Sequence, residues 1–158
     1  MIKKVLSLFI LMGLGYISIE LIYTALTSQS IRLVGYSSIW MVLVGGTVGT
    51  FLGMWNEIPI MREIFYRLHV LMGWVTCITA EYGFGLILNR NLGLGLWDYS
   101  NNFLNVNGQI DFLHSMCWLA MVPFAFWLDD CLRFLLFKEE RPRPLYTYYL
   151  RLISERFA

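Results

Sequence analysis

The sequence predicts an all-α membrane protein, a bundle of four transmembrane helices with both ends in the cytoplasm. Of its 158 residues 58% are hydrophobic and only 15% are charged, a balance unusual for soluble domains. The apolar residues form four runs, each close to the roughly 20 residues that cross a bilayer. We therefore expect a transmembrane domain over residues 1–137, with spans at about 5–26, 39–55, 68–88 and 110–137, and a cytoplasmic tail over 138–158.

The distribution of basic residues predicts the orientation of these spans. Cytoplasmic connections carry an excess of Lys and Arg. With both termini inside, the first end, the middle connection and the tail would hold ten of the twelve basic residues: Lys3, Lys4, Arg62, Arg67, Arg133, Lys138, Arg141, Arg143, Arg151 and Arg156. The two outer connections would hold one each, Arg32 and Arg90.

The first run resembles a signal peptide in its basic start and apolar middle, but it lacks a cleavage site of the A-x-A type. We expect an uncleaved first span. The second run contains "GGTVGTFLG", which places Gly45, Gly49 and Gly53 on one helical face. Small residues at this spacing let a neighbouring helix approach closely, so this face predicts helix packing and assembly of a homo-oligomer.

Four ionisable residues lie inside the runs: Glu20, Glu81, Asp111 and His114. The predicted topology places them at similar depth in the outer half of the bilayer. Such groups are costly in a membrane and face a bundle interior or a cavity. We interpret them as a polar intramembrane site, and a hydrogen-bonded network that only orients the helices is an equal alternative. Their spacing on separate helices gives no indication of a metal site.

The connection before the fourth run, "GLWDYSNNFLNVNGQIDFLHS", is unusually rich in Trp, Tyr and Asn. Asn, Asp and Gly form turns and caps. We expect it to fold inward over the polar residues as an outer lid, formed by Trp97, Asp98, Tyr99, Ser100, Asn107 and Gln109. In this hypothesis Asp98 accepts backbone or Asn hydrogen bonds, and Tyr99, Asn107 and Gln109 supply donors to the Glu81 layer. The alternative is a loop anchored by its aromatic residues.

The end of the fourth run and the tail carry two further patterns. Asp129 and Asp130 are spaced to meet Arg133 one turn later as a local ion pair at the helix exit. The tail predicts an amphipathic helix that lies on the inner membrane surface or docks on a cytoplasmic partner. Its apolar face consists of Leu145, Tyr148, Tyr149, Leu152, Ile153 and Phe157.

Several of these motifs together resemble the bacterial family of putative ABC-transporter type IV proteins, which are small multi-pass membrane proteins. The likeness rests on "AEYGFGLILN", "LWDYSNNFLNVNGQI" and "LDDCLRFLLF" and covers about Arg32 to Pro144. The matching positions are Glu81, Trp97, Asp98, Tyr99, Asn107, Gly108 and Gln109. The chain departs from the pattern at Asp111, where a Cys or apolar residue is expected, and at His114.

The resemblance implies a permease-like component of a transporter in the bacterial cytoplasmic membrane. The sequence contains no GxxxxGK[ST] motif, so ATP-driven transport would need a separate ATPase subunit. The alternative is a non-transporting structural or regulatory membrane protein that assembles through its glycine face. No Ser–His or metal signature with suitable spacing indicates an enzyme. We expect no cofactor, and the bilayer rather than nucleic acid as a partner.

Overall fold

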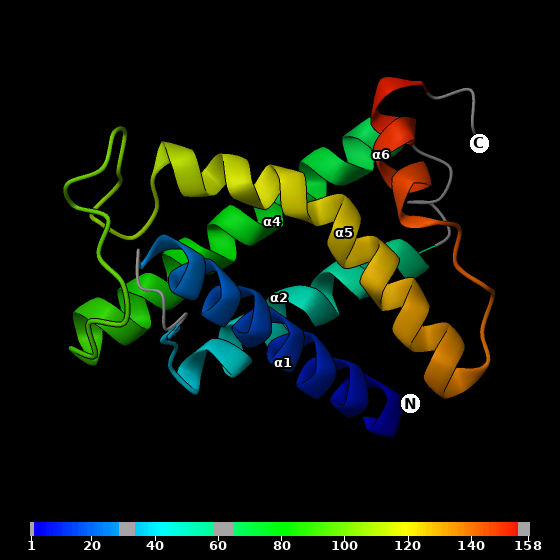
Figure 1. Cartoon of the computed structure of the whole chain (residues 1–158), viewed down its shortest axis with the longest axis horizontal. Coiled ribbons are helices and arrows are strands. Elements are labelled where there is room, and N and C mark those ends of the chain that lie inside the picture. The colour runs from blue at the N-terminus through cyan, green and yellow to red at the C-terminus, as the bar shows by residue number, and fades with distance from the viewer. Residues whose placement is uncertain (1, 29–33, 59–64, 155–158) are drawn as a thin grey trace. The chain divides into compact units, whose positions relative to one another are not determined.

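The computed structural model describes residues 2–28, 34–58 and 65–154. Arg32, Arg62, Arg156 and Phe157 lie outside these ranges. All regular elements of the described residues are helical: α1 (Ile2–Thr27), α2 (Trp40–Glu57), α4 (Tyr66–Phe84), a π-helix η1 (Gly85–Asn91), α5 (Phe112–Phe137) and α6 (Leu145–Ile153) (Figure 1). This confirms the all-α class. The chain forms two compact units, Met1–Phe51 and Leu52–Ala158.

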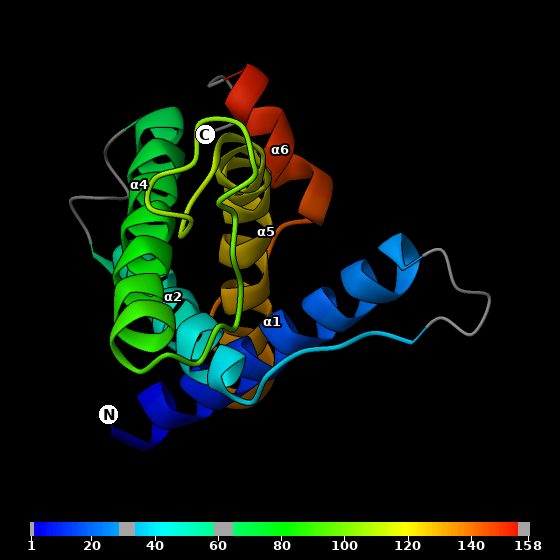
Figure 2. The same cartoon turned by 90° about the vertical axis from the view of Figure 1, so that its left-hand side faces the viewer.

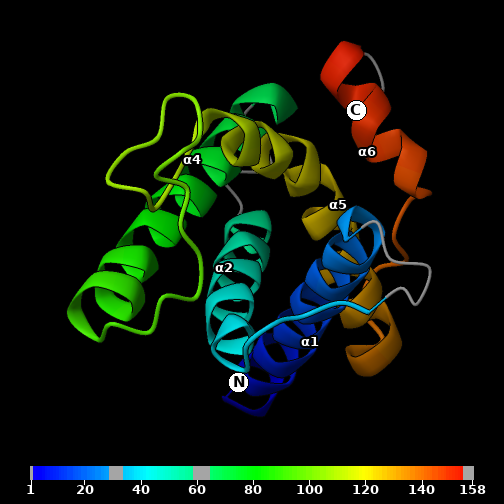
Figure 3. The ribbon, with the colours of Figure 1, turned by 60° about the vertical axis from the view of Figure 1, so that its left-hand side comes forward.

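In the first unit, α1 and the start of α2 cross each other with glycines at the contact (Figure 3). A Cβ added to Gly49 would lie 2.6 Å from Cβ of Met12, and one added to Gly45 would collide with Tyr16. Further contacts of the same kind join Gly13 to Val42 and Gly46 to Phe9, so glycines from both helices allow the close crossing.

In the second unit, α4 and α5 lie side by side (Figure 2). Their contact is filled by Val70, Gly73, Val122 and Phe126, all buried. A Cβ on Gly73 would lie 2.8 Å from Cγ1 of Val122, so the absence of a side chain allows the close approach. The π-helix η1 continues α4 without a break, and α5 continues through Pro123, which lies inside the helix.

Two helices of the described residues are long and apolar enough to cross a membrane, α1 and the continuous helix Tyr66–Asn91, while Trp40–Trp55 is a shorter apolar helix. The four-span bundle therefore remains a prediction. On Tyr66–Asn91 several large apolar side chains face outward; Val75 is 52% exposed and Leu71 46%. An exposed apolar side chain on a long helix is compatible with contact with lipid.

Candidate functional site

The connection between η1 and α5 folds back on itself and is held by its own hydrogen bonds. The backbone N–H of Tyr99 donates to the carbonyl of Gly108 at 2.8 Å, and Val106 and Ile110 form an antiparallel bridge. The amide of Asn105 donates to the carbonyls of Ser100 and Asn102, both at 3.0 Å. These bonds give the connection a defined shape, as the turn residues of the sequence predict.

Gly108 is required where the two arms of this connection meet. Its φ is +69°, a conformation that other residues adopt rarely. A Cβ at this position would also lie 2.8 Å from Oδ1 of Asp98. The carboxylate of Asp98 accepts hydrogen bonds from the hydroxyl and the backbone N–H of Ser100. These two donors lower the pKa of Asp98 below its ordinary value, because they stabilise the charged form.

Asn89 on η1 attaches the connection to the helix below it. Its side-chain carbonyl accepts from the N–H of Leu96 at 2.7 Å, and its amide donates to the carbonyl of Trp97 at 3.0 Å and to Oε1 of Gln109 at 2.9 Å. The indole N–H of Trp97 donates to the carbonyl of Gln109 at 3.1 Å. Asn89 is absent from the sequence prediction. Its position at the end of an apolar run was the one indication in the sequence.

Glu81 is buried on α4, with 6% of its surface exposed, and receives donors from two distant segments. The hydroxyl of Tyr99 donates to Oε1 at 3.3 Å, and the indole N–H of Trp118 on α5 donates to Oε2 at 2.8 Å. Both carboxylate oxygens of Glu81 therefore have a neutral donor. A buried carboxylate needs such donors because burial removes its hydration.

The expected donors Asn107 and Gln109 bond elsewhere, so that part of the lid prediction is wrong. The amide of Asn107 donates to the hydroxyl of Tyr82 at 2.7 Å, and the amide of Gln109 donates to the carbonyl of Asn107 at 3.2 Å. Trp118, which the sequence analysis does not select, takes their place. A Trp in an apolar helix gives no indication of the face to which its N–H points.

Asp111 and His114 lie beside this layer at the start of α5. Asp111 is the N-cap residue and accepts from the backbone N–H of His114 at 2.7 Å. Its carboxylate also contacts Nδ1 of His114 at 2.9 Å and accepts from the amide of Asn102. The ring of His114 stacks on Tyr99 with centroids 4.2 Å apart. Tyr99 therefore contacts both Glu81 and His114, and the two stacked rings connect the carboxylate of Glu81 to that of Asp111.

Glu20 belongs to the first unit, where the hydroxyl of Ser37 donates to its carboxylate. Its predicted convergence with Glu81 stays a prediction. Gly45 and Gly49 pack against α1 in that unit, whereas Gly53, in the second unit, has the carboxylate of Asp129 where its Cβ would be. The three glycines are thus covered by side chains of their own units.

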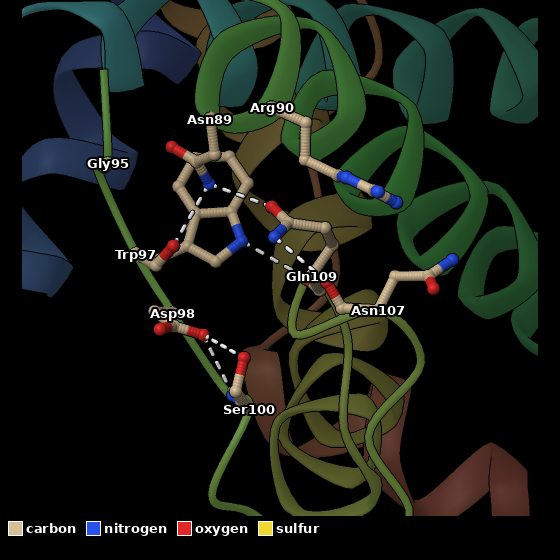
Figure 4. Close-up of a pocket in the computed structure, with 8 residues that line it drawn as sticks. All are labelled: Asn89, Arg90, Gly95, Trp97, Asp98, Ser100, Asn107 and Gln109. Carbon is tan, nitrogen blue, oxygen red and sulfur yellow. Dashed lines mark hydrogen bonds between the residues drawn. The ribbon is translucent and has the colours of Figure 1, made fainter. Parts of the chain in front are cut away.

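A pocket of about 410 Å³ opens between η1 and the connection. It is lined by Asn89, Arg90, Gly95, Trp97, Asp98, Ser100, Asn107 and Gln109 (Figure 4). Five of the six predicted lid residues line this pocket. The sixth, Tyr99, turns toward Glu81 instead. The connection therefore has two faces, one toward the buried Glu81 layer and one toward this open polar pocket.

The opposite part of α4 and α5 receives α6. The hydroxyl of Tyr148 donates to Asp130, and the guanidinium of Arg67 donates to the carbonyls of Leu152 and Ile153 at 2.7 and 2.8 Å. The face of α6 that holds Tyr148 thus docks on its own chain, whereas Ile153 is 76% exposed. The predicted ion pair of Asp129 and Arg133 is present but fully buried. Burial of Tyr148 and its bond to Asp130 raise the pKa of Tyr148.

The comparison with family models identifies the family of the chain. The model of the family described as putative ABC-transporter type IV matches residues 6–141. The chain belongs to this family. The matched range contains Glu81, the connection and the pocket. No curated protein and no solved structure matches the chain. The resemblance found in the sequence motifs is thereby confirmed at the level of the family.

Proposed function

We propose that the chain is a multi-pass protein of the bacterial cytoplasmic membrane that acts as the permease-like component of a transporter. The family name supports a transport-related role. The long apolar helices α1 and Tyr66–Asn91 and the clustering of basic residues near one set of predicted span ends support a membrane position. In this orientation the connection between η1 and α5 faces outward and α6 faces the cytoplasm.

The observation on which the proposal rests is the buried carboxylate of Glu81 beneath an ordered polar connection. An ionisable group inside a membrane helix marks a functional site by default. Neutral donors, Tyr99 and Trp118, hold Glu81, and one of them belongs to the connection. A movement of the connection would remove the Tyr99 bond and expose the carboxylate. The connection would then act as a gate between the outside and the Glu81 layer.

ATP-driven transport requires a separate ATPase subunit in this proposal. Such a subunit would bind at the cytoplasmic end of the second unit. The end of α5 and helix α6 lie there, and α6 has exposed apolar side chains. Leu150 and Ile153 remain exposed on α6, at 41% and 76%. They offer apolar area to a protein partner or to the inner membrane surface.

Cysteine labelling tests the orientation. Ser100→Cys, in a chain whose Cys77, Cys117 and Cys131 are replaced, should react with a membrane-impermeant maleimide in intact cells. The matched variant Arg141→Cys should react only after the membrane is permeabilised. Labelling of position 100 from the cytoplasmic side alone would contradict the orientation.

A complementation experiment tests the role in transport. A strain that lacks the gene is supplied with the wild-type chain, Glu81→Gln or Glu140→Gln, and small molecules in the medium and in the cells are profiled. A transport component should restore the wild-type distribution with Glu140→Gln and fail with Glu81→Gln at equal protein level. Equal restoration by both variants would favour the alternative, a structural or regulatory protein.

A structural or regulatory protein that assembles through its glycine face has little support, because that face is already covered. Gly45 and Gly49 already contact Tyr16 and Met12 of the same unit. A second copy of the chain would have to displace α1 to reach them. The predicted homo-oligomer therefore needs another surface, and light scattering of the protein in detergent measures whether it forms.

A further inference from the structure

The pocket between η1 and the connection contains one cationic and one anionic side chain that do not pair with each other. Arg90 extends from η1, and Asp98 lies on the connection (Figure 4). In the described part of the chain Arg90 makes no ion pair and no hydrogen bond. The remaining lining is neutral, with amides from Asn89, Asn107 and Gln109. Opposite charges kept apart in one pocket fit a ligand that carries both charges.

The two charged groups offer complementary binding geometry. Arg90 presents five N–H donors in a planar fork, which suits phosphate and carboxylate groups. In Asp98, Oδ1 accepts both hydrogen bonds from Ser100. Oδ2 accepts none from the described residues and is available to an ammonium group. The bonds from Ser100 fix the direction of that oxygen, so the site for the ammonium group is oriented in advance.

The pocket is formed before any ligand arrives. Asn89 holds Leu96, Trp97 and Gln109 in place through three hydrogen bonds. Gly85, at the start of η1, allows Gln109 to pack against the helix, because a Cβ there would lie 2.5 Å from Oε1 of Gln109. Segments of π-helix occur often at functional sites, and η1 supplies both Asn89 and Arg90. Preorganisation of this kind lowers the entropic cost of binding.

We propose that this pocket binds a zwitterion, with its phosphate or carboxylate on Arg90 and its ammonium group on Asp98. The inference rests on the proposed function, because that function places the pocket on the outer side of the membrane, and it names the class of molecule that binds there. The same chemistry occurs in a free amino-alcohol phosphate and in the headgroup of phosphatidylethanolamine. Both sources reach an outward-facing pocket at the level of the headgroups.

Equilibrium dialysis in detergent tests the free form with two probes, O-phosphoethanolamine and ethyl phosphate, which lacks the ammonium group. The wild-type chain should bind O-phosphoethanolamine more tightly than ethyl phosphate. Arg90→Gln should weaken binding of both probes by about tenfold, since a charge-assisted contact is lost. Asp98→Asn should weaken O-phosphoethanolamine alone, and Arg141→Gln should bind as wild type. Gel filtration confirms that each variant is folded.

Native mass spectrometry from nanodiscs tests the lipid form. The wild-type chain should retain phosphatidylethanolamine over phosphatidylglycerol. Asp98→Asn should lose that preference, and Arg90→Gln should retain less of both lipids. Binding in dialysis identifies a free zwitterion, whereas retention in nanodiscs alone identifies the headgroup. If neither experiment depends on Arg90 and Asp98, the inference is overturned. Because the complementation experiment depends on Glu81, its outcome separates this failure from failure of the proposed function.

Discussion

The pair of helices α4 and α5 holds buried carboxylates at both of its ends, but by different means. Near η1, Glu81 is bonded by two neutral donors, Tyr99 and Trp118. Near α6, the buried Asp129 is bonded by the guanidinium of Arg133, which also lies 3.8 Å from Glu57 and from Glu139. Among the described residues, no cationic side chain forms an ion pair with Glu81, whereas Asp129 has a countercharge one turn away on the same helix.

This difference separates a structural end from an adaptable end. Asp129 and Arg133 lie one turn apart on α5, so their contact persists as long as the helix does. Tyr99 reaches Glu81 from a connection outside the helices, so this contact can open without unfolding α4 or α5. The pocket also lies at this end, where the connection is held by hydrogen bonds of its backbone and side chains rather than by a packed core.

The largest effect is expected at the structural end. Arg133→Met should lower the free energy of unfolding by about 3–5 kcal/mol, because it leaves Asp129 buried without its countercharge. Chemical unfolding in detergent measures the change. Arg141→Met removes an exposed charge from the linker and should change the stability little. If Arg133→Met lowers the free energy of unfolding no more than Arg141→Met does, the ion pair does not stabilise this end, and the distinction between the two ends is wrong.

Gly85→Ala should disturb the adaptable end by about 1–3 kcal/mol, because the new Cβ forces Gln109 from its place. Gly83 is the matched control, since a Cβ at that position meets no atom within 4 Å. Gly83→Ala should leave stability unchanged or raise it slightly through helix propensity. Thermal unfolding in detergent compares the two variants, and equal effects would contradict the packing of Gln109 against η1.

Glu81→Gln and Tyr99→Phe should each cost about 1 kcal/mol and should be non-additive in combination, since both alter the hydrogen bond between these two side chains. The lid hypothesis, in which the connection holds the Glu81 layer together, also implies coupling between Glu81 and Asp98. The structure alters this expectation, because Asp98 is exposed and bonds to Ser100. We therefore expect Glu81→Gln and Asp98→Ala to add. A double-mutant cycle of unfolding free energies distinguishes the two pairs.

The smallest effect is expected at Asp98 itself. Ser100→Ala removes the hydroxyl donor and should raise the pKa of Asp98 toward 3.8, its ordinary value. A lowered pKa in the folded state gives stability that is present above the ordinary pKa and is lost as the pH falls through the folded pKa. This loss of stability should therefore be seen only below about pH 4. Carbon NMR titration of the Asp98 carboxyl measures the shift, and an unchanged pKa in Ser100→Ala would contradict the assigned cause.

Apolar runs and turn residues predicted much of the fold. The four runs correspond to the helices α1, α2, α4 with η1, and α5, with ends within a few residues of the predicted ones. The observed boundaries differ because helices continue until a cap or a turn ends them. The fourth helix, for example, begins after the N-cap residue Asp111 and ends at Lys138 with a φ of +58°. Neither feature is visible in hydropathy alone.

The site was less predictable than the fold. Glu81, Asp111, His114 and the aromatic connection were selected because charges and Asn residues stand out in an apolar sequence. Trp118 and Asn89 were not selected, although they make decisive contacts. Glu81 and Trp118 are 37 residues apart, and their contact depends on how α4 and α5 are rotated about their axes.

The sequence by itself determined the helical class, the apolar lengths, the glycine face of α2 and the turn-forming character of the connection. These properties depend on each residue and on neighbours within a few positions, so a linear pattern is sufficient to express them. Tertiary packing decided which donor meets Glu81, which side chains cover the glycines and where Tyr148 of α6 docks. Such contacts depend on the fit of side chains across helices. Many rotations of an apolar helix about its axis are nearly equivalent in hydropathy, but they differ in which buried polar atoms find partners.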